Sequence, residues 1–363
     1  MAVLDEYFRL MVERKASDLH LTVGMPPILR LSGEMTPIEG RAVNTEASNR
    51  SAILEIMPQK NREEFEARRD SDFAYALEGA GRFRANVFMD RGGIGAVFRL
   101  IPEKILTAEQ LGLSEEIRKL CFLSKGLVLV TGPTGSGKST TLAAMVDHVN
   151  THRADHIITI EDPIEFVHPN RKCLVNQREV HTHTQSFASA LRAALREDPD
   201  IVLVGEMRDL ETTRIAIETA ETGHLVFGTL HTNTAPSTVD RLINQFPANE
   251  QDQIRLMLAS SLKGVISQTL LRRIGGGRVA ALEVLLTTPA VSANIREGKT
   301  HQIASIMQTG MKQGMVLLND AMMKLVRTKQ VEPKDAYIKA VDKDDFVKKL
   351  NLEGFRLGLA AEA

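Results

Sequence analysis

The 363-residue chain exceeds what one hydrophobic core usually serves, so we expect two domains. Hydrophobic residues make up 43% of it and charged residues 25%, a globular composition that excludes wholesale disorder. The 45 Lys and Arg residues against 46 Asp and Glu leave a net charge of -1, which offers no general attraction to nucleic acid.

Further features exclude other classes of protein. No apolar run approaches the roughly 18 residues of a membrane helix, and the N-terminal segment carries acids, unlike a signal peptide, so we expect a soluble intracellular protein. Cys121 and Cys173 form no CxxC pair, which argues against a disulfide framework and a cysteine zinc site. With 4% aromatic residues and no Trp, a base-stacking platform for single-stranded nucleic acid is poorly supplied.

The first hundred residues predict a small α+β domain with antiparallel pairing. Apolar residues recur at helical spacing near the N-terminus and over residues 47–56, and short extended pieces lie at 19–22 and 28–31. Two strand-like runs, 83–88 and 95–100, are separated by MDRGGI, whose paired glycines suit a tight connection.

After a linker over about residues 101–112, the sequence predicts a second domain with a parallel sheet. Apolar strands that include residues 127–131, 201–204 and 225–230 alternate with helical segments, which indicates βαβ units with covered faces. Beyond about residue 237 the pattern is mostly helical, with GGGR at 275–278 marking a turn. The expected domains are therefore residues 1–100 and 101–363.

The segment GPTGSGKS at residues 132–139 matches GxxxxGK[ST] between a strand and a helix, which predicts a phosphate-binding loop. Its backbone amides and the helix N-terminus can hold an anion, Lys138 can reach the β- and γ-phosphates, and the Ser139 hydroxyl can ligate Mg²⁺. The expected nucleotide contacts are Gly132, Pro133, Thr134, Gly135, Ser136, Gly137, Lys138, Ser139 and Thr140.

Two further strands end in acids, where open α/β sheets place their ligands. Strand 201–204 runs into Glu206, which we expect to hold a Mg²⁺-bound water. Strand 156–160 runs into Glu161, Asp162 and Glu165, among which the pattern alone does not select a general base. A strand between the phosphate loop and the second acidic strand is typical of RecA-like ATPases and favours ATP hydrolysis over phosphoryl transfer to a small acceptor.

The strand at residues 225–230 ends in His231 and is preceded by Glu221. Such a histidine can be a structural residue, but at a strand end it can also bind a γ-phosphate or an orienting acid such as Glu221. In the second case it would sense whether ATP is intact.

These features together resemble the secretion-type traffic ATPases, and among them the type IV pilus retraction motors of the PilT/PilU kind. The resemblance covers nearly the whole chain and is carried by collinear segments: ASDLHLTVGMPPILRLSGEM, GRFRANVF, GAVFR, TGPTGSGKSTTLAAM, IEDPIEFVH, LVNQREVHT, ALREDPDIVLVGEMRDLETT and ETGHLVFGTLHT. So many ordered matches do not arise by chance.

The resemblance implies a PAS-like N-terminal domain joined flexibly to a RecA-like domain, assembled as a homo-hexamer with ATP between neighbours. It implies that Glu165 is the general base, that Glu206 is an atypical Walker B acid and that His231 belongs to a His box. Gly205 stands where many other P-loop ATPases have Asp. Glu206 would then hold the magnesium water shell together with Ser139.

The resemblance also suggests roles for arginines and for partners. Some of Arg82, Arg84 and Arg99 would contact phosphates across a domain or subunit junction, the alternative being ordinary solvated strand residues. The chain would act in twitching motility from the cytoplasmic side, with an inner-membrane pilus platform protein, a paralogous motor ATPase as a further possible partner, and no nucleic acid.

One segment departs from the family pattern and leaves alternatives open. Retraction motors carry AIRNLIRE where residues 290–297 read AVSANIRE, so Ser292 replaces the first Arg. An accessory retraction paralogue is therefore an alternative. A pilus assembly or type II secretion ATPase is another, although the missing CxxC pairs weigh against it. A nucleic-acid translocase and a non-hydrolysing ring subunit are less favoured.

Overall fold

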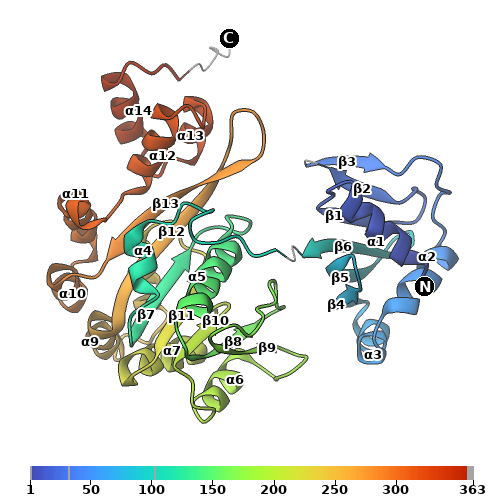
Figure 1. Cartoon of the computed structure of the whole chain (residues 1–363), viewed down its shortest axis with the longest axis horizontal. Coiled ribbons are helices and arrows are strands. Elements are labelled where there is room, and N and C mark those ends of the chain that lie inside the picture. The colour runs from blue at the N-terminus through green and yellow to red at the C-terminus, as the bar shows by residue number, and fades with distance from the viewer. Residues whose placement is uncertain (1, 32, 102–103, 358–363) are drawn as a thin grey trace. The chain divides into compact units, whose positions relative to one another are not determined.

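The computed structural model describes residues 2–31, 33–101 and 104–357, and the chain divides into two compact units (Figure 1). The first unit is Met1–Lys104 and the second is Ile105–Ala363. Residues 102–103 of the expected linker lie outside the described residues.

In its described residues, the first unit forms a six-stranded antiparallel sheet in the order β3-β2-β1-β6-β5-β4. Its strands are β1 (Asp18–Leu21), β2 (Ile28–Leu31), β3 (Glu34–Pro37), β4 (Asp70–Leu77), β5 (Gly81–Asp90) and β6 (Gly93–Ile101). Its helices are α1 (Val3–Glu13), α2 (Glu46–Ile56) and α3 (Gln59–Arg68).

Alternation along the strands gives this sheet one apolar and one polar face. On β5, Phe83, Ala85 and Val87 are buried, whereas Arg82 and Arg84 lie on the other face. The apolar face packs against residues of α1 and α2 in one hydrophobic core. The polar face is therefore available for interactions.

In its described residues, the second unit forms a seven-stranded sheet in the order β13-β12-β7-β11-β10-β8-β9 (Figure 1). Every neighbouring pair is parallel except β12 with β13. Its strands are β7 (Gly126–Thr131), β8 (His156–Glu161), β9 (Leu174–Glu179), β10 (Ile201–Val204), β11 (Leu225–Leu230), β12 (Leu262–Arg272) and β13 (Arg278–Leu286). The predicted class, an α/β domain with a parallel-rich sheet after a smaller α+β domain, is confirmed.

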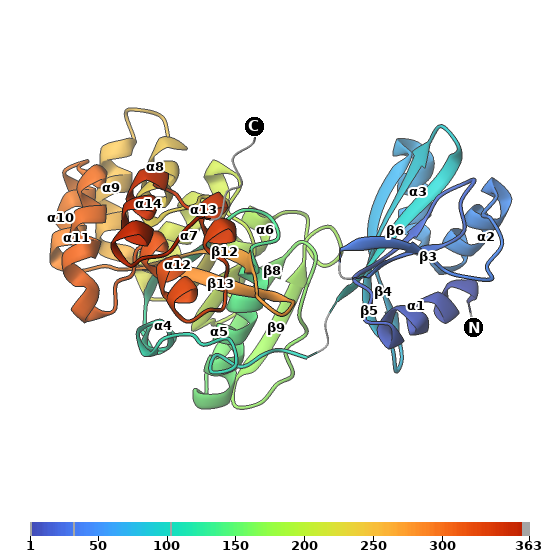
Figure 2. The same ribbon diagram turned by 90° about the horizontal axis from the view of Figure 1, so that it is seen from above.

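Helices cover both faces of this sheet (Figure 2). Val128 and Val130 of β7 pack with α4 and α5, whereas Leu127 and Leu129 of the same strand share a core with α6 to α9. The helices are α4 (Glu115–Leu120), α5 (Lys138–His152), α6 (Phe187–Ala194), α7 (Leu210–Thr222), α8 (Ala235–Asn244), α9 (Gln251–Ser261), α10 (Pro289–Arg296), α11 (Ile303–Thr309), α12 (Leu318–Arg327), α13 (Pro333–Lys339) and α14 (Lys343–Leu352), with short 3₁₀ turns at Thr300–Gln302 and Gly310–Gln313. No helix in the described residues is long and apolar enough to cross a lipid bilayer.

Beyond residue 237 most elements are helices, as expected, but the expectation missed a long hairpin formed by β12 and β13 (Figure 1). Most β12 residues are buried on both faces, which removes the polar alternation that would reveal a strand. The glycines at 275–277 do form the predicted turn, at the tip of this hairpin. Helices α12 to α14, here called the C-terminal subdomain (residues 318–352), pack against Leu271 and Ala281 of the hairpin.

Candidate active site

The phosphate-binding loop connects β7 to α5, as the motif predicts. Gly132 has φ +145°, and a Cβ there would lie 2.3 Å from the backbone oxygen of Gln268. Only glycine fits this position. Gly137 precedes α5 in the left-handed conformation, so the loop ends at a helix N-terminus, where anions are favoured.

The ammonium group of Lys138 lies within the loop. Its Nζ donates to the backbone oxygens of Gly132 at 2.8 Å and Pro133 at 3.3 Å. Burial lowers the pKa of Lys138, and the negative charges of Glu206 and Glu165 oppose that shift. The structure therefore brings the predicted lysine and both predicted acids into electrostatic contact.

Glu206 follows β10 and is held by the side chains of His231 and Arg208. His231 Nε2 donates to Glu206 Oε1 at 2.7 Å, and Arg208 forms an ion pair with the same oxygen. Burial by itself would raise the pKa of Glu206, but the hydrogen bonds and charges of Arg208 and His231 bring it below its ordinary value. Glu206 is therefore an ionised carboxylate at neutral pH.

The structure also explains the glycine that replaces the usual Asp before Glu206. A Cβ at Gly205 would lie 3.0 Å from the backbone oxygen of Ile160 and 3.2 Å from Cα of Glu161, both on neighbouring β8. These atoms are backbone and cannot move aside easily. The acid at this strand end must therefore come one residue later.

The acids that follow β8 differ in their surroundings. Glu161 accepts hydrogen bonds from Thr159 Oγ1 at 2.7 Å and Gln177 Nε2 at 3.1 Å, and burial raises its pKa. Its other oxygen lies 3.5 Å from the backbone nitrogen of Glu165. The side chain of Glu165 is exposed, as is that of Asp162. Glu161 thus holds the loop, while Glu165 remains available to a reactant.

The expected pairing of His231 with Glu221 is wrong. Glu221 lies near the end of α7, four residues before β11 begins, and accepts a hydrogen bond from Ser260 Oγ at 3.1 Å. Since β11 pairs in parallel with β7, Glu221 lies at the amino-terminal ends of these strands, whereas the phosphate-binding loop lies at their carboxyl ends. His231 follows the carboxyl end of β11 and meets Glu206 instead.

Two residues at the site escaped the sequence reasoning. Gln268 is buried on β12, where its Nε2 donates to the Ser136 backbone oxygen at 2.6 Å and its Oε1 accepts from Thr141 Oγ1 at 2.8 Å. The sequence around Gln268 contains no pattern from which its contacts with the phosphate-binding loop could be predicted. Arg208 had a weak signal, since it follows the strand-end acid Glu206 by two residues.

The three predicted arginines belong to the first unit and lie on the polar face of its sheet. Arg84 pairs directly across from Arg99, which in turn pairs with Asp18, and Asp18 pairs with Arg30. The Asp18 side chain is 5% exposed and accepts from Arg99 Nε at 2.8 Å, with Arg30 Nε at 3.8 Å. We call Arg30, Asp18, Arg99 and Arg84 the charged row. Arg82 lies two residues from Arg84 on the same face of β5.

The charged row carries more positive than negative charge. It holds three arginines and one aspartate, and Arg84 opposes Arg99 in register, while the Nε of Arg84 also lies 3.8 Å from Asp72 Oδ1 on β4. Directly opposed like charges destabilise a sheet. The Arg99 side chain is nonetheless 67% exposed and is bonded to Asp18 through its Nε, so its terminal nitrogens are accessible to an anion.

Comparisons with known proteins identify a family and similar chains. A model of the type II/IV secretion system protein family matches residues 1–330. A Pseudomonas aeruginosa protein named type IV pilus retractation ATPase PilT is 51% identical over 348 residues, which cover 94% of this chain and 99% of that protein. The type IV pilus ATPase PilU of the same organism is 39% identical, over 94% of this chain and 89% of that one. The crystal structure of the pilus retraction motor PilT with bound ADP aligns with a TM-score of 0.89 at 46% identity, over 96% of this chain and 99% of that chain.

Proposed function

The chain belongs to the type II/IV secretion system protein family, and from this premise we propose that it is an ATP-hydrolysing motor that retracts type IV pili. The resemblance to retraction motors that the sequence motifs indicated is confirmed by the relatives. The observation that carries the chemistry is Glu206, held ionised by His231 and Arg208 and in electrostatic contact with Lys138.

The residues of the phosphate-binding loop fit a nucleoside triphosphate. The Ser136 hydroxyl is buried with no hydrogen-bond partner in the described residues, so the loop retains an unused donor on its inner side. Lys138 is held by two backbone oxygens, which are weaker partners than phosphate oxygens. We infer that an incoming phosphate takes Lys138 from these oxygens and accepts hydrogen bonds from the loop.

The donor set also fits Mg²⁺. Ser139 and Glu206 offer the hydroxyl and carboxylate oxygens that this ion prefers. In the described residues no cluster of three His, Cys, Asp or Glu side chains could hold a metal, so the ion would also need phosphate oxygens and water. When bound, Mg²⁺ would supply charge neutralisation on the β- and γ-phosphate oxygens.

Glu165 is the general base in this proposal. It is exposed, and its charge acts on Lys138, whereas Glu161 is occupied by Thr159 and Gln177. Glu165 would orient the attacking water and accept its proton. His231, bound to Glu206, would report on the γ-phosphate through that carboxylate.

The first unit would contribute positive charge to the reaction. We propose that the chain assembles as a homo-hexamer and that Arg99 or a neighbouring arginine, Arg82 or Arg84, contacts the phosphates of a bound nucleotide. The exposed guanidinium of Arg99, held at its Nε by buried Asp18, supports this. Loss of the γ-phosphate would remove its partner and shift one unit relative to the next.

The proposed partners are an inner-membrane platform protein of the pilus machine and a paralogous motor ATPase, met from the cytoplasmic side. The higher identity to PilT than to PilU, 51% against 39%, favours a principal retraction motor over an accessory one. Cells that lack the gene test this directly. Hyperpiliated, immobile cells are expected, whereas bald cells would indicate an assembly motor.

The Ser292 departure does not disturb the fold. Ser292 lies on α10 and donates through its Oγ to the backbone oxygen of Ala259 at 2.8 Å, while Val291 and Ile295 of the same helix are buried. Ser292 therefore joins α10 to α9 through a short hydroxyl side chain. A gene carrying Ser292→Arg, tested for twitching in the deletion strain, shows whether this contact limits retraction.

A nucleic-acid translocase is the second candidate, because RecA-like domains also move along DNA. The net charge of -1 and the scarcity of aromatic residues oppose it. Strong stimulation of ATP hydrolysis by DNA, declining steeply with salt, would reverse this ranking.

A further inference from the structure

Glu283 is a carboxylate buried in the second unit without a cationic partner. It lies on β13 and is 3% exposed. Its Oε1 accepts the backbone N–H of Ala235 at 2.6 Å, and its Oε2 accepts the backbone N–H of Leu318 at 3.1 Å. No lysine, arginine or histidine in the described residues forms an ion pair with it. Such a group needs an explanation, because burial of an unpaired charge is costly.

Both donors are the first residues of helices. Ala235 begins α8 and Leu318 begins α12. Burial raises the pKa of Glu283, and the two backbone N–H groups oppose that shift. The partial positive charge of two helix N-termini replaces a cation here. Leu317, which precedes α12, supplies no side-chain cap, so Glu283 caps this helix from another element.

The first of these helices is joined to the active site. His231, which binds Glu206, lies four residues before Ala235. In the first turn of α8, the Thr238 hydroxyl lies 2.7 Å from that of Thr232 and 3.5 Å from that of Thr131. Thr131 immediately precedes the phosphate-binding loop. The start of α8 therefore fixes the His231 segment against the loop.

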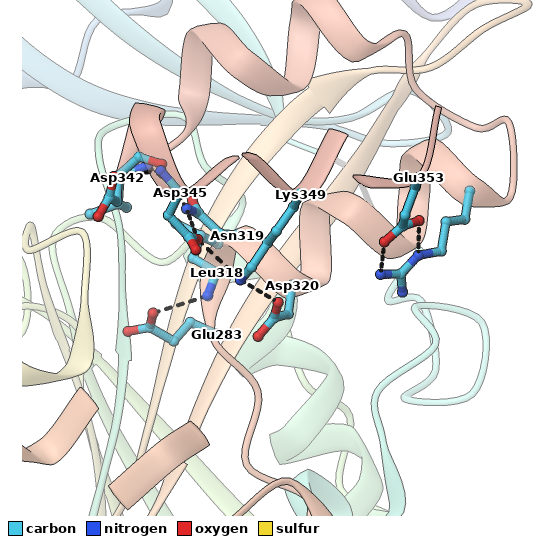
Figure 3. Close-up of polar contacts among 10 residues, drawn as sticks. Glu283, Leu318, Asn319, Asp320, Asp342, Asp345, Lys349 and Glu353 are labelled. Carbon is cyan, nitrogen blue, oxygen red and sulfur yellow. Dashed lines mark hydrogen bonds and ion pairs between the residues drawn. The ribbon is translucent and has the colours of Figure 1, made fainter. Parts of the chain in front are cut away.

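The second helix organises the C-terminal subdomain (Figure 3). Beside Leu318, Asn319 Nδ2 donates to the backbone oxygen of Asp342 at 2.8 Å and to Asp345 Oδ2 at 3.0 Å. The ammonium of Lys349 donates to Asp320 Oδ1 at 2.7 Å. The first turn of α12 is thus bonded to α14 and to the residue that precedes it.

We propose that Glu283 is a positioning residue that couples the His231 segment of the active site to the C-terminal subdomain. A displacement of the start of α8 during hydrolysis must either carry α12 with it or leave a buried carboxylate with one partner. The second outcome is unfavourable, because a buried charged group that loses a hydrogen bond keeps its full desolvation penalty. By linkage, whatever favours one position of the subdomain favours the matching position of the His231 segment by the same free energy.

This inference rests on the proposed ATP hydrolysis at Glu206 and Lys138, and the first test measures that activity. Glu283→Gln removes one acceptor oxygen and turns an amide donor toward one of the two N–H groups. In the full-length chain we expect kcat to fall about tenfold with KM for ATP nearly unchanged, because the phosphate-binding loop is untouched.

Asn319→Ala is the matched control. It loosens α12 from α14 and leaves both bonds to Glu283 in place. We expect it to lower the melting temperature comparably and to leave kcat within about twofold of wild type. A merely structural role for Glu283 would make the two variants behave alike in kcat.

Amide hydrogen exchange provides a second test, which requires nucleotide binding but no ATP turnover. The wild-type chain is measured first. We expect the amides at the start of α12 to exchange at different rates with ADP and with a non-hydrolysable ATP analogue. In Glu283→Gln that difference should vanish. If this variant does not fold, Glu283→Asp replaces it, because the shorter carboxyl side chain cannot reach both helices.

Identical exchange of α12 with both nucleotides in the wild type, or wild-type kcat in Glu283→Gln, would overturn the coupling. A wild-type chain that hydrolyses no ATP would instead overturn the proposed function.

Discussion

The two sheets of this chain carry their charged side chains in different places. In the seven-stranded sheet, Glu206 and His231 follow the carboxyl ends of adjacent parallel strands, beside the phosphate-binding loop. In the six-stranded sheet, the charged row lies across one face. A parallel sheet gathers its strand ends at one edge, whereas an antiparallel sheet brings distant residues together through register.

The two arrangements suit different tasks. Groups on loops at strand ends can close around a single phosphate beside a helix N-terminus. Groups in a row start from backbone positions fixed at the strand spacing of about 4.8 Å, so only the reach of their side chains brings them to a ligand. The comparison teaches that the parallel sheet gathers its groups around the phosphate-binding loop, while the antiparallel sheet offers a row of mainly positive charge.

Removal of the Glu206 charge has the largest expected effect and tests the strand-end part of this comparison. Glu206→Gln retains the shape of the side chain but loses the charge that acts on Lys138. We expect kcat for ATP hydrolysis to fall at least about 100-fold, as when one electrostatic group is lost from an active site. Phosphate release by the purified full-length chain measures it.

Glu218→Gln is the control for that variant, because Glu218 is exposed on α7 of the same unit. Its turnover should match wild type. Substantial hydrolysis by Glu206→Gln would show that the strand-end acid does not act in the chemistry, and the contrast between the sheets would fail.

Asp18→Asn tests the charged row and should have the next largest effect. Asparagine retains an acceptor for Arg99 but loses the charge that orients it and offsets the neighbouring arginines. Under the proposal that Arg99 contacts the phosphates, we expect kcat to fall about tenfold, because a misplaced cation stabilises the developing phosphate charge poorly.

A double-mutant cycle with Arg99→Gln identifies the route of that effect. If Asp18 acts through Arg99, the two substitutions together cost little more than Arg99→Gln alone. Additive losses would show that Asp18 acts on another group, and Glu34→Gln on edge strand β3 controls for a general effect of lost charge on this unit.

The strand-end groups could be predicted from the sequence because each adjoins a recognisable strand in the chain. Glu206 follows the buried run Ile201–Val204, and His231 follows Leu225–Leu230. The prediction for Glu221 failed for a related reason: Glu221 comes before its strand, so it lies at the amino-terminal ends of the parallel strands. A residue reaches the site only if it follows the carboxyl end of its strand.

The supporting contacts could not be predicted, because they join segments that are distant in the sequence. Arg99 and Asp18 are 81 positions apart, and Gln268 and Ser136 are 132 apart. Their meeting depends on which distant segments become neighbours in the folded chain, and a pattern within one segment does not show this. Strand β12, which carries Gln268, was itself missed because burial on both faces removes its alternation.

Gln268→Ala sharpens the comparison by testing how the phosphate-binding loop is held from a neighbouring strand. The change leaves the Thr141 hydroxyl and the Ser136 backbone oxygen without their buried partner. We expect the free energy of unfolding to fall by about 2 kcal/mol, the cost of unsatisfied buried polar groups. Urea denaturation measures this, and calorimetry should show weaker ADP binding. Thr269→Ala on the same strand is the control, and equal losses from both variants would contradict a specific role for Gln268.

The smallest expected effect concerns Glu161, whose carboxyl group contacts the backbone of the loop that carries Glu165. Because burial raises its pKa in the folded chain, the folded state binds this proton more tightly than the unfolded state does. Its contribution to stability is therefore greatest below the ordinary carboxyl pKa of 4.5 and is lost as the pH rises through the raised value. Glu161→Gln cannot ionise, so its unfolding free energy should depend less on pH, by at most about 1.4 kcal/mol per pH unit.

Denaturation of the wild-type chain and of Glu161→Gln from pH 4.5 upward provides the measurement. Parallel curves would mean that Glu161 is ionised in the fold, with the same pKa as in the unfolded chain, and that it differs from Glu206 in position alone.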